Sequence, residues 1–247
     1  MLLLKMFQRR WLLLTLLVLA GTALCVHLGI WQLDRLEQRR AFNAQFEAGR
    51  AAPVLRLNRD VPEDISTMEW RAVHVTGEYD LENQVAIRNR YYGNKYGYHL
   101  LTPLRFGDAA VLVDRGWIPA EGNSSAVNWD RYDETGTVNV SGQIRLGQAK
   151  PSFGGVADQL PADGSRLEIW NNADVAQIAG QMPYPLLPVY IQPEADSADT
   201  EPPIPFQPDV ELTEGSHFGY ALQWFTFATI LFFGYPFYLQ KQEQGSR

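Results

Sequence analysis

The sequence predicts a membrane protein in which two transmembrane α-helices flank a mainly antiparallel β (α+β) domain outside the membrane. Two observations support this fold class. Apolar stretches lie near both ends, at residues 11–33 and 216–239, and short segments of alternating polarity fill residues 34–215. About 20 apolar residues in a helix span a bilayer core of about 30 Å. Residues 1–10 and 240–247 then form short termini.

The first apolar stretch fits an uncleaved anchor better than a signal peptide. Basic residues precede it, as in a signal peptide, but Leu24 precedes Cys25 where a cleavage site requires a small residue. Cys25 is the only cysteine, so no intrachain disulfide is possible in the domain outside the membrane. Residues 34–48 are helix-forming, and either continue the first helix or follow it after a bend.

The charges around the second stretch predict the orientation of the chain. Seven acidic residues and no Lys or Arg occur between Pro193 and Ser216, whereas Lys241 and Arg247 follow the helix. Lys and Arg favour the cytoplasmic side. We therefore expect both termini in the cytoplasm and the domain in the periplasm of a bacterium, as a multi-pass inner membrane protein. In a mitochondrion the same arrangement would place the domain in the intermembrane space.

Between the helices the pattern is typical of strands. About seven short strands with few helices between them favour an antiparallel sheet or a small barrel over a parallel, nucleotide-binding sheet. Asn172 is expected to cap one short helix before Pro183, and residues 195–208 are expected to form an acidic, proline-rich tether. The expected strands begin near Arg71, Gln84, Tyr96, Ala110, Val138, Arg166 and Leu186.

The domain carries few signatures of chemistry. It has no nucleophile elbow, no glycine-rich phosphate loop and no Cys or His pair at zinc spacing. His74 and His99 lie on expected strands, where histidine is more often packed or at the surface than catalytic. The net charge of −7 and the absence of a basic patch argue against nucleic acid as a partner. A binding domain is therefore expected rather than an enzyme.

Polar residues within the membrane stretches are the stronger functional candidates, because a polar group in hydrocarbon needs a partner. His27 and Trp31 share one side of the first helix with small residues that allow close approach of another helix. His217, Tyr220 and Trp224 share one side of the second helix. Both histidines are expected near the outer leaflet, where they could bracket one ligand. Haem suits an imidazole in an aromatic, apolar cleft, whereas interfacial anchoring is the alternative explanation.

Six segments carry distinctive motifs in order through nearly the whole chain. They are GIWQLDRLEQR from Gly29, GEYD from Gly77, RNR from Arg88, GYHLLTPL from Gly97, DRGWIP from Asp114 and HFGYALQWF from His217. These segments resemble the surfeit locus protein one family of cytochrome c oxidase assembly factors. Two departures are Asp114, where Asn is common, and Ser216, where Asn often precedes the histidine. Residues 123–163 carry no motif that can be placed.

The resemblance implies that the chain binds haem a and assists its insertion into the catalytic subunit of haem-copper oxidase. His217 is then the candidate iron ligand, and His27 is a second candidate that rests on helix geometry alone. Tyr220 and Trp224 would line the macrocycle, and Arg35 or Arg115 would pair with its propionates. Haem a synthase is a further candidate partner, beside membrane lipid. Candidate contacts with a partner protein are Trp31, Gln32, Trp117 and Gln223.

Two other classes of function stay open. One is a structural chaperone that stabilises an oxidase assembly intermediate without haem. The other is a membrane-anchored hydrolase or lipid-modifying enzyme, which would need a nucleophile and base that the sequence does not offer. For the segment of Arg115 and Trp117, a strand-end turn with a packed tryptophan is as good an explanation as a functional role. Which oxidase is served and the oligomeric state are not predicted.

Overall fold

The structure is a computed structural model that describes residues 6–149, 155, 157–195, 200–206 and 210–244. Its contacts divide the chain into two compact units. We call residues 1–45 and 211–247 the helix-pair unit and residues 46–210 the barrel unit. Each unit is described by itself.

Helix α2 (Arg9–Ala51) is one unbroken helix of 43 residues, so residues 34–48 continue the first helix. It contains no proline, and it ends two residues before Pro53, which disfavours helical geometry in the residue before it. Helix α4 (His217–Gln244) begins directly after Gly215 and Ser216, and Gly215 has a left-handed φ of 67°. Both expected long helices therefore form.

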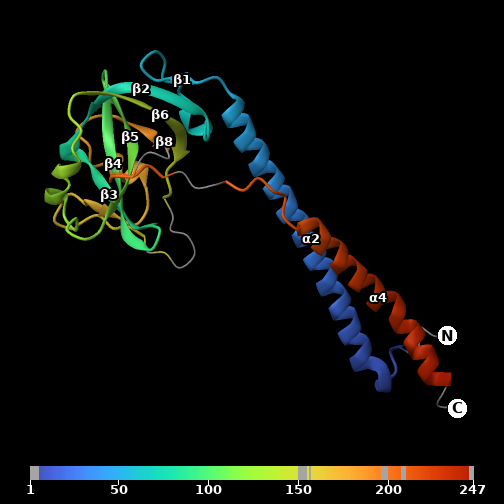
Figure 1. Cartoon of the computed structure of the whole chain (residues 1–247). Coiled ribbons are helices and arrows are strands. Elements are labelled where there is room, and N and C mark those ends of the chain that lie inside the picture. Colours follow the sequence, from blue (N-terminus) through green and yellow to red (C-terminus); the bar gives the residue numbers. More distant parts are fainter. Residues whose placement is uncertain (1–5, 150–154, 156, 196–199, 207–209, 245–247) are drawn as a thin grey trace. The chain divides into compact units, whose positions relative to one another are not determined.

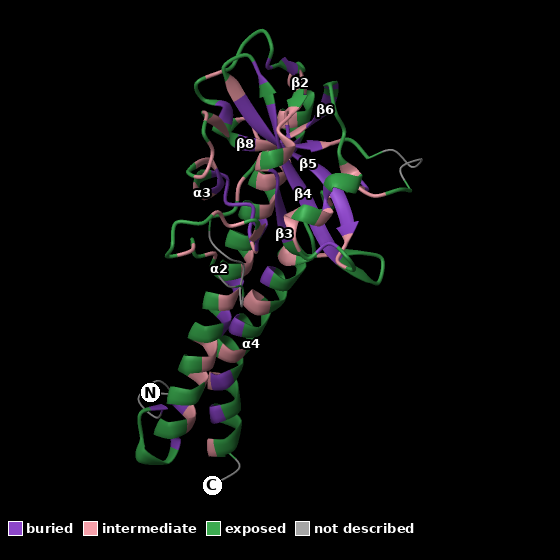
Figure 2. Ribbon diagram, turned by 90° about the vertical axis from the view of Figure 1, so that its left-hand side faces the viewer, coloured by how far each residue is buried: buried purple, intermediate pink, exposed green. Residues whose placement is uncertain are grey.

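The two helices lie side by side and antiparallel in the helix-pair unit (Figure 1). Near one end, the Thr15 hydroxyl lies 2.6 Å from the Tyr235 hydroxyl. Further along, a Cβ atom on Gly29 would come within 2.7 Å of the Phe225 ring, so the absent side chain permits this close approach. Most other side chains of the pair are exposed (Figure 2).

One of these helices has the properties of a membrane span. By length and apolar composition α2 is a candidate span, and among the helices in the described residues it alone meets that criterion. Side chains such as Leu13, Leu16 and Leu17 are more than half exposed on its surface. The first expected span is therefore supported, whereas the second is not shown.

The barrel unit holds one mixed sheet of eight strands, in the order β1-β2-β6-β8-β5-β4-β3-β7. Five neighbouring pairs are antiparallel, and β1–β2, β3–β7 and β5–β8 are parallel, so the expectation of a mainly antiparallel sheet is correct but incomplete. The strands are β1 (Leu55–Arg56), β2 (Ala72–Tyr79), β3 (Val85–Tyr92), β4 (Lys95–Phe106), β5 (Ala109–Pro119), β6 (Thr137–Leu146), β7 (Ile169–Trp170) and β8 (Leu186–Pro193).

The sheet closes on itself because β2 pairs with both β6 and β4. Glu78 and Tyr79 of β2 lie opposite Arg105 and Leu104 of β4. A Cβ atom on Gly77 would lie 2.2 Å from the Arg105 carbonyl oxygen, so only glycine allows the two backbones to meet there. Strands β2, β6, β8, β5 and β4 thus form a small barrel.

The interior of the barrel is filled by branched aliphatic side chains. Val75, Val111 and Val189 have no solvent exposure and belong to the main core cluster. A second cluster, around Trp170, lies between β3 and α3 (Val175–Ala179). The single-turn helices are η1 (Ile65–Thr67), η2 (Leu81–Asn83), η3 (Ala126–Asn128) and η4 (Asp130–Tyr132).

Two local expectations were wrong. Helix α3 is capped by Asp174, whose carboxylate accepts a hydrogen bond from the Gln177 backbone N–H at 3.2 Å, and not by Asn172. The expected tether is docked in part, because Ile204 forms a bridge with Trp117 of β5 through N···O distances of 2.8 and 2.9 Å. Residues 196–199 and 207–208 of the expected tether lie outside the described residues.

Candidate functional site

His217 is the first residue of α4, and its imidazole contacts α2. Its Nδ1 atom lies 2.8 Å from Oε1 of Gln32. Because an amide oxygen only accepts hydrogen bonds, Nδ1 carries the proton in this pair and Nε2 keeps its lone pair. The imidazole is half-buried, and no described residue hydrogen-bonds to Nε2. A histidine fixed in this way is oriented to bind a metal through its free nitrogen.

The segment before α4 is held on the same helix. Arg40 binds Glu214 through two N–H···O contacts of 2.8 Å each. Hydrogen bonding from Arg40 lowers the pKa of Glu214, so this pair is charged at neutral pH. Asn43 donates to the Leu212 carbonyl at 2.7 Å, and Arg39 donates to the Thr213 carbonyl at 3.0 Å. These contacts fix the start of α4, and with it the position of His217.

Aromatic side chains follow His217 along α4. Tyr220 is 48% exposed, and Trp224 is half-buried and packs edge-on against Phe227 with ring centroids 6.0 Å apart. Gln223 is exposed and has no described hydrogen bond. The imidazole is thus followed by an accessible aromatic surface, as the helical spacing predicts.

On α2, a cation lies close to Gln32 in sequence. The Arg35 guanidinium lies 5.5 Å from the centre of the Trp31 ring and donates to Gln38 at 2.9 Å. Arg35 is exposed and three residues from Gln32, so the two side chains are neighbours on the helix surface. Trp31 is exposed, as a membrane anchor or a partner contact would be. Gln32 instead has a contact within the chain, to His217.

No described contact joins His27 to His217, and the expectation that the two histidines bracket one ligand stays a prediction. His27 is exposed, whereas Cys25 and Gly29 on either side of it are buried. With 3.6 residues per turn, His27 is rotated about 140° from Gln32 around the α2 axis. The face of α2 that meets α4 therefore excludes His27.

Arg115 and Trp117 belong to the barrel unit. Trp117 is 3% exposed and packs against Tyr92, with ring centroids 5.5 Å apart, so it is a core residue rather than a surface contact. Arg115 is 8% exposed, lies 5.0 Å from the centre of the Tyr79 ring and donates to the Tyr132 carbonyl. Burial raises the pKa of Tyr79 to about 12. Nη1 of Arg115 is buried without a described hydrogen-bond partner.

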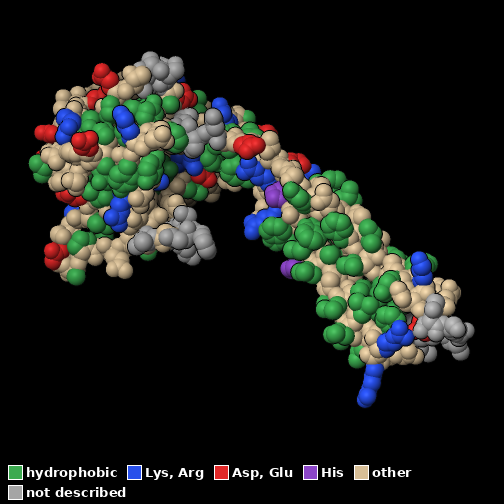
Figure 3. Space-filling view, turned by 60° about the horizontal axis from the view of Figure 1, so that its bottom comes forward, with side chains coloured by type: hydrophobic (Ala, Val, Ile, Leu, Met, Phe, Trp, Pro, Cys, Tyr) green, Lys and Arg blue, Asp and Glu red, His purple; other side chains and the backbone are tan. Residues whose placement is uncertain are grey.

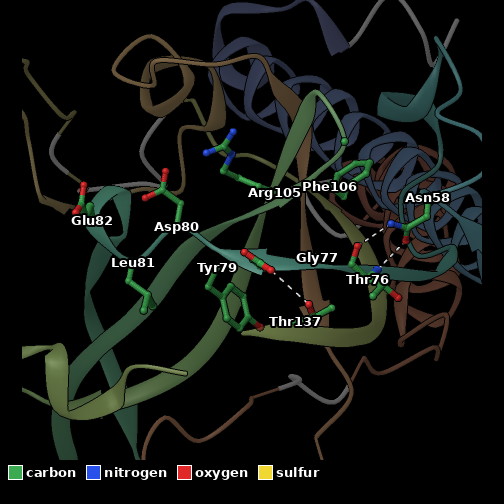
Figure 4. A pocket seen from close by; sticks show the side chains of 12 residues that line it. Asn58, Thr76, Gly77, Tyr79, Asp80, Leu81, Glu82, Arg105, Phe106 and Thr137 are labelled. Atoms are coloured by element: carbon green, nitrogen blue, oxygen red, sulfur yellow. Dashed lines mark hydrogen bonds between the residues drawn. The ribbon is translucent and has the colours of Figure 1, made fainter. Parts of the chain in front are cut away.

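A cavity of about 730 Å³ lies along β2 and η2 in the barrel unit (Figure 4). Asp80, Glu82 and Arg105 line it and give it mixed charge. Among the described residues, no group of three or more His, Cys, Asp or Glu side chains is arranged to hold a metal ion.

Asp80 at this cavity makes a testable contribution to stability. Burial raises its pKa, but hydrogen bonds from Tyr184, at 2.6 Å, and Asn83 outweigh burial, and the pKa is lowered overall. Tyr184→Phe should destabilise the barrel by about 1–2 kcal/mol at neutral pH. A carboxyl group whose pKa is lower in the folded than in the unfolded state stabilises the fold fully above its unfolded-state pKa, and this stabilisation is lost as the pH falls through the folded-state pKa. The difference in stability between wild type and Tyr184→Phe should therefore shrink below about pH 4.

Urea unfolding of wild type and Tyr184→Phe at several pH values measures this effect. Tyr91→Phe is the matched control, because Tyr91 is 63% exposed and its hydroxyl has no described hydrogen bond. A loss that stays constant from pH 7 to well below pH 4 would show that the Asp80 carboxylate is not the stabilised partner.

Sequence reasoning missed two features. The Arg40–Glu214 pair joins residues 174 positions apart, and opposite charges in the two sequence segments of the helix-pair unit were its only signal. In the barrel, buried His99 and Asp114 form a pair with Nδ1 and Oδ2 2.9 Å apart. The HLLTPL and DRGW segments contain both residues, but pairing between strands depends on register, which spacing along one strand does not reveal.

The chain is similar in sequence to proteins of one family. A sequence model of the SURF1 family matches residues 19–229, from α2 into α4. A SURF1-like protein of Rickettsia felis is 25% identical over 231 residues, covering 90% of this chain and 95% of that protein. A SURF1-like protein of Monosiga brevicollis is 26% identical, over 82% and 78% of the two chains. An uncharacterized SURF1-like protein of Mycobacterium bovis is 30% identical, over 69% and 64%.

Proposed function

Because this chain belongs to the SURF1 family, which is linked to cytochrome oxidase assembly, we propose that it binds haem a and assists its insertion into the catalytic subunit of a haem-copper oxidase. Haem a is the cargo in this proposal, and the protein breaks and makes no covalent bond. The catalytic oxidase subunit is the receiving partner, and haem a synthase is the candidate donor.

The observation that carries the proposal is the orientation of His217. Gln32 accepts the Nδ1 proton and leaves Nε2 as the ligand atom, which is the usual arrangement for a metal-binding histidine. Haem iron takes an imidazole as an axial ligand, while the macrocycle packs on apolar and aromatic surface. Tyr220 and Trp224 supply such surface on the same helix.

Arg35 is the propionate partner that this site favours. It is an exposed cation on α2, three residues beyond Gln32, and its guanidinium can bind a carboxylate with two hydrogen bonds. Arg115 belongs to the barrel unit, and its role as a propionate partner stays a prediction. The site does not depend on His27.

We also propose that α4 is a second membrane span. Large apolar side chains are exposed along it and over the visible face of the helix pair (Figure 3). Water would not favour so much apolar surface, whereas a bilayer would cover it. With the acidic segment before α4 outside, both termini lie in the cytoplasm and the barrel unit in the periplasm or intermembrane space. The exposed side chains of α4 include Phe218, Leu222, Phe227, Ile230, Phe232, Phe233 and Phe237.

One observation favours the haem-independent chaperone instead. The contact of His217 with Gln32 also ties α4 to α2, so the histidine could serve only to hold the helices together. A test must therefore separate a ligand role from a helix contact.

Complementation of a strain that lacks the protein provides this test. We expect His217→Ala and His217→Gln each to lower the amount of assembled, haem-containing oxidase at least about tenfold, because neither side chain is a good iron ligand. Gln32→Ala should lower it less, since an orienting partner tunes the ligand without replacing it. Immunoblots for protein level and Thr226→Ala, at an exposed position of α4 whose hydroxyl bonds only within the helix, serve as controls.

The haem-binding function and the chaperone function predict different rankings of the variants by the amount of assembled oxidase. If His217 only ties the helices together, His217→Gln should keep activity, since its amide can still hydrogen-bond to Gln32, and Gln32→Ala should be as harmful as His217→Ala. That result would contradict the haem proposal and support the chaperone.

A further inference from the structure

A second polar cavity, of about 340 Å³, lies in the barrel unit. None of the residues considered for haem lines it. We call it the His99 cavity. Strands β3, β4, β5 and β8 contribute side chains to it, and Phe206 from the docked segment after β8 lies against His99 with ring centroids 6.0 Å apart. Its polar lining includes Arg90, His99, Asp114, Arg145, Tyr190 and Gln192.

The deepest groups of the cavity form a buried pair. His99 is 6% and Asp114 7% exposed, and Oδ2 of Asp114 lies 2.9 Å from Nδ1 of His99. The other carboxylate oxygen accepts the Gly116 backbone N–H at 3.1 Å. With Nδ1 engaged, Nε2 is the atom of this pair that is left for another partner. Burying such a pair costs desolvation energy that a purely structural role does not require.

Backbone irregularities on both neighbours of β4 shape this cavity. The pairing of β3 with β4 shifts between Ile87 and Arg90, where Asn89 has a φ of 63°. The pairing of β5 with β4 shifts after Asp114, where Gly116 has a φ of 119°. Such bulges re-aim side chains and are over-represented beside functional sites. Here they accompany Arg90 and Asp114, which both line the cavity.

Arg90 is the cation of the cavity lining that has no side-chain partner among the described residues. Asp114 is paired with His99, and Arg145 contacts Glu69 at 3.4 Å and donates to Gln192 at 3.0 Å. No described side chain binds the Arg90 guanidinium, although its backbone carbonyl accepts from Trp117.

The Tyr190 hydroxyl, a further polar group of the cavity, is also a hydrogen-bond donor. The Tyr190 hydroxyl has no hydrogen bond within the described residues, and burial raises its pKa, so it stays protonated. Arg90 and Tyr190 would thus present N–H and O–H groups to a ligand.

We propose that the His99 cavity binds a small oxyanion, a carboxylate or a phosphate group. The Arg90 guanidinium provides the opposite charge, and the Tyr190 hydroxyl donates a hydrogen bond to the bound oxygens. A cavity of this size admits a small anion or the acidic end of a larger molecule. The proposal uses no residue of the helix-pair unit and is independent of haem binding.

Isothermal titration of the full-length protein in detergent, at constant ionic strength, tests the proposal with two probes, inorganic phosphate and succinate. Saturable binding on the order of millimolar or tighter is expected for at least one of them. The stronger probe identifies the preferred class of oxyanion. Absence of saturable binding of either probe to the folded wild-type protein would overturn the proposal.

Matched variants assign the binding to this cavity. Arg90→Gln and Tyr190→Phe should weaken it, the first at least about tenfold, because a charge-assisted hydrogen bond is lost. Arg88→Gln is the control, since Arg88 is an exposed cation of the same strand that binds Asn171 instead of lining the cavity. Binding that is unchanged in both cavity variants, or weakened equally by Arg88→Gln and Arg90→Gln, would show that the anion binds elsewhere. Circular dichroism confirms that each variant is folded.

Discussion

Replacing Trp129 by alanine should lower the free energy of unfolding of the barrel by about 3–5 kcal/mol, the usual cost of removing a buried tryptophan. Trp129 has no solvent exposure and packs with Tyr98, Leu100 and Ile118 in one core cluster. Its indole N–H donates to the Asn123 carbonyl at 3.0 Å. The substitution removes this bond and leaves a cavity that these rigid strands cannot close.

Chemical unfolding followed by far-ultraviolet circular dichroism measures the loss. Val127→Ala is the matched control in the same turn, because Val127 is 81% exposed, and it should change stability by less than about 0.5 kcal/mol. Trp129→Phe should lie between the two. A loss below about 1 kcal/mol for Trp129→Ala would contradict the assignment of this turn to the core.

Gly116→Ala should destabilise the barrel by about 2–5 kcal/mol, from left-handed strain and two backbone hydrogen bonds. Gly116 has a φ of 119°, and an added Cβ would lie 2.3 Å from the carbonyl carbon and oxygen of Ile204. The new methyl group would therefore push Ile204 off β5, where it exchanges hydrogen bonds with Trp117.

The control for Gly116→Ala is Gly107→Ala. Gly107 also has a positive φ, of 57°, but nothing lies within 4 Å of its added Cβ. It should cost only the strain, about 1–2 kcal/mol. Hydrogen exchange should show faster exchange of the Trp117 and Ile204 amides in Gly116→Ala alone. Equal losses in both variants, with unchanged exchange, would mean that the docked segment does not depend on Gly116.

Local sequence patterns predicted the elements that depend on composition and period. The two long helices follow from apolar and helix-forming runs, and the strands follow from alternation around Val73, Val75, Val85 and Ile87. The position of His217 at the start of a helix, with aromatic residues after it, was also predictable. These features arise from contacts between residues near one another in sequence.

Features that depend on distant contacts were not predictable in the same way. Closure of the barrel at Gly77 and the parallel pairing of β5 with β8 are set by three-dimensional register. The docking of Ile204 depends on the bulge at Gly116 rather than on its own proline-rich surroundings. The exposure of His27 was not predictable, because an apolar helix does not reveal which of its faces meets a partner helix.

The proposed function depends on whether His217 binds haem through Nε2. The most direct measurement is the absorption spectrum of the full chain, purified in detergent from cells that make haem a, with pyridine haemochrome identification of the haem. We predict a stoichiometric amount of haem a in the wild type and its loss in a His217→Ala variant that keeps the wild-type circular dichroism spectrum. A wild-type protein without haem, or a variant that retains it in equal amount, would contradict the assignment of His217 as the ligand.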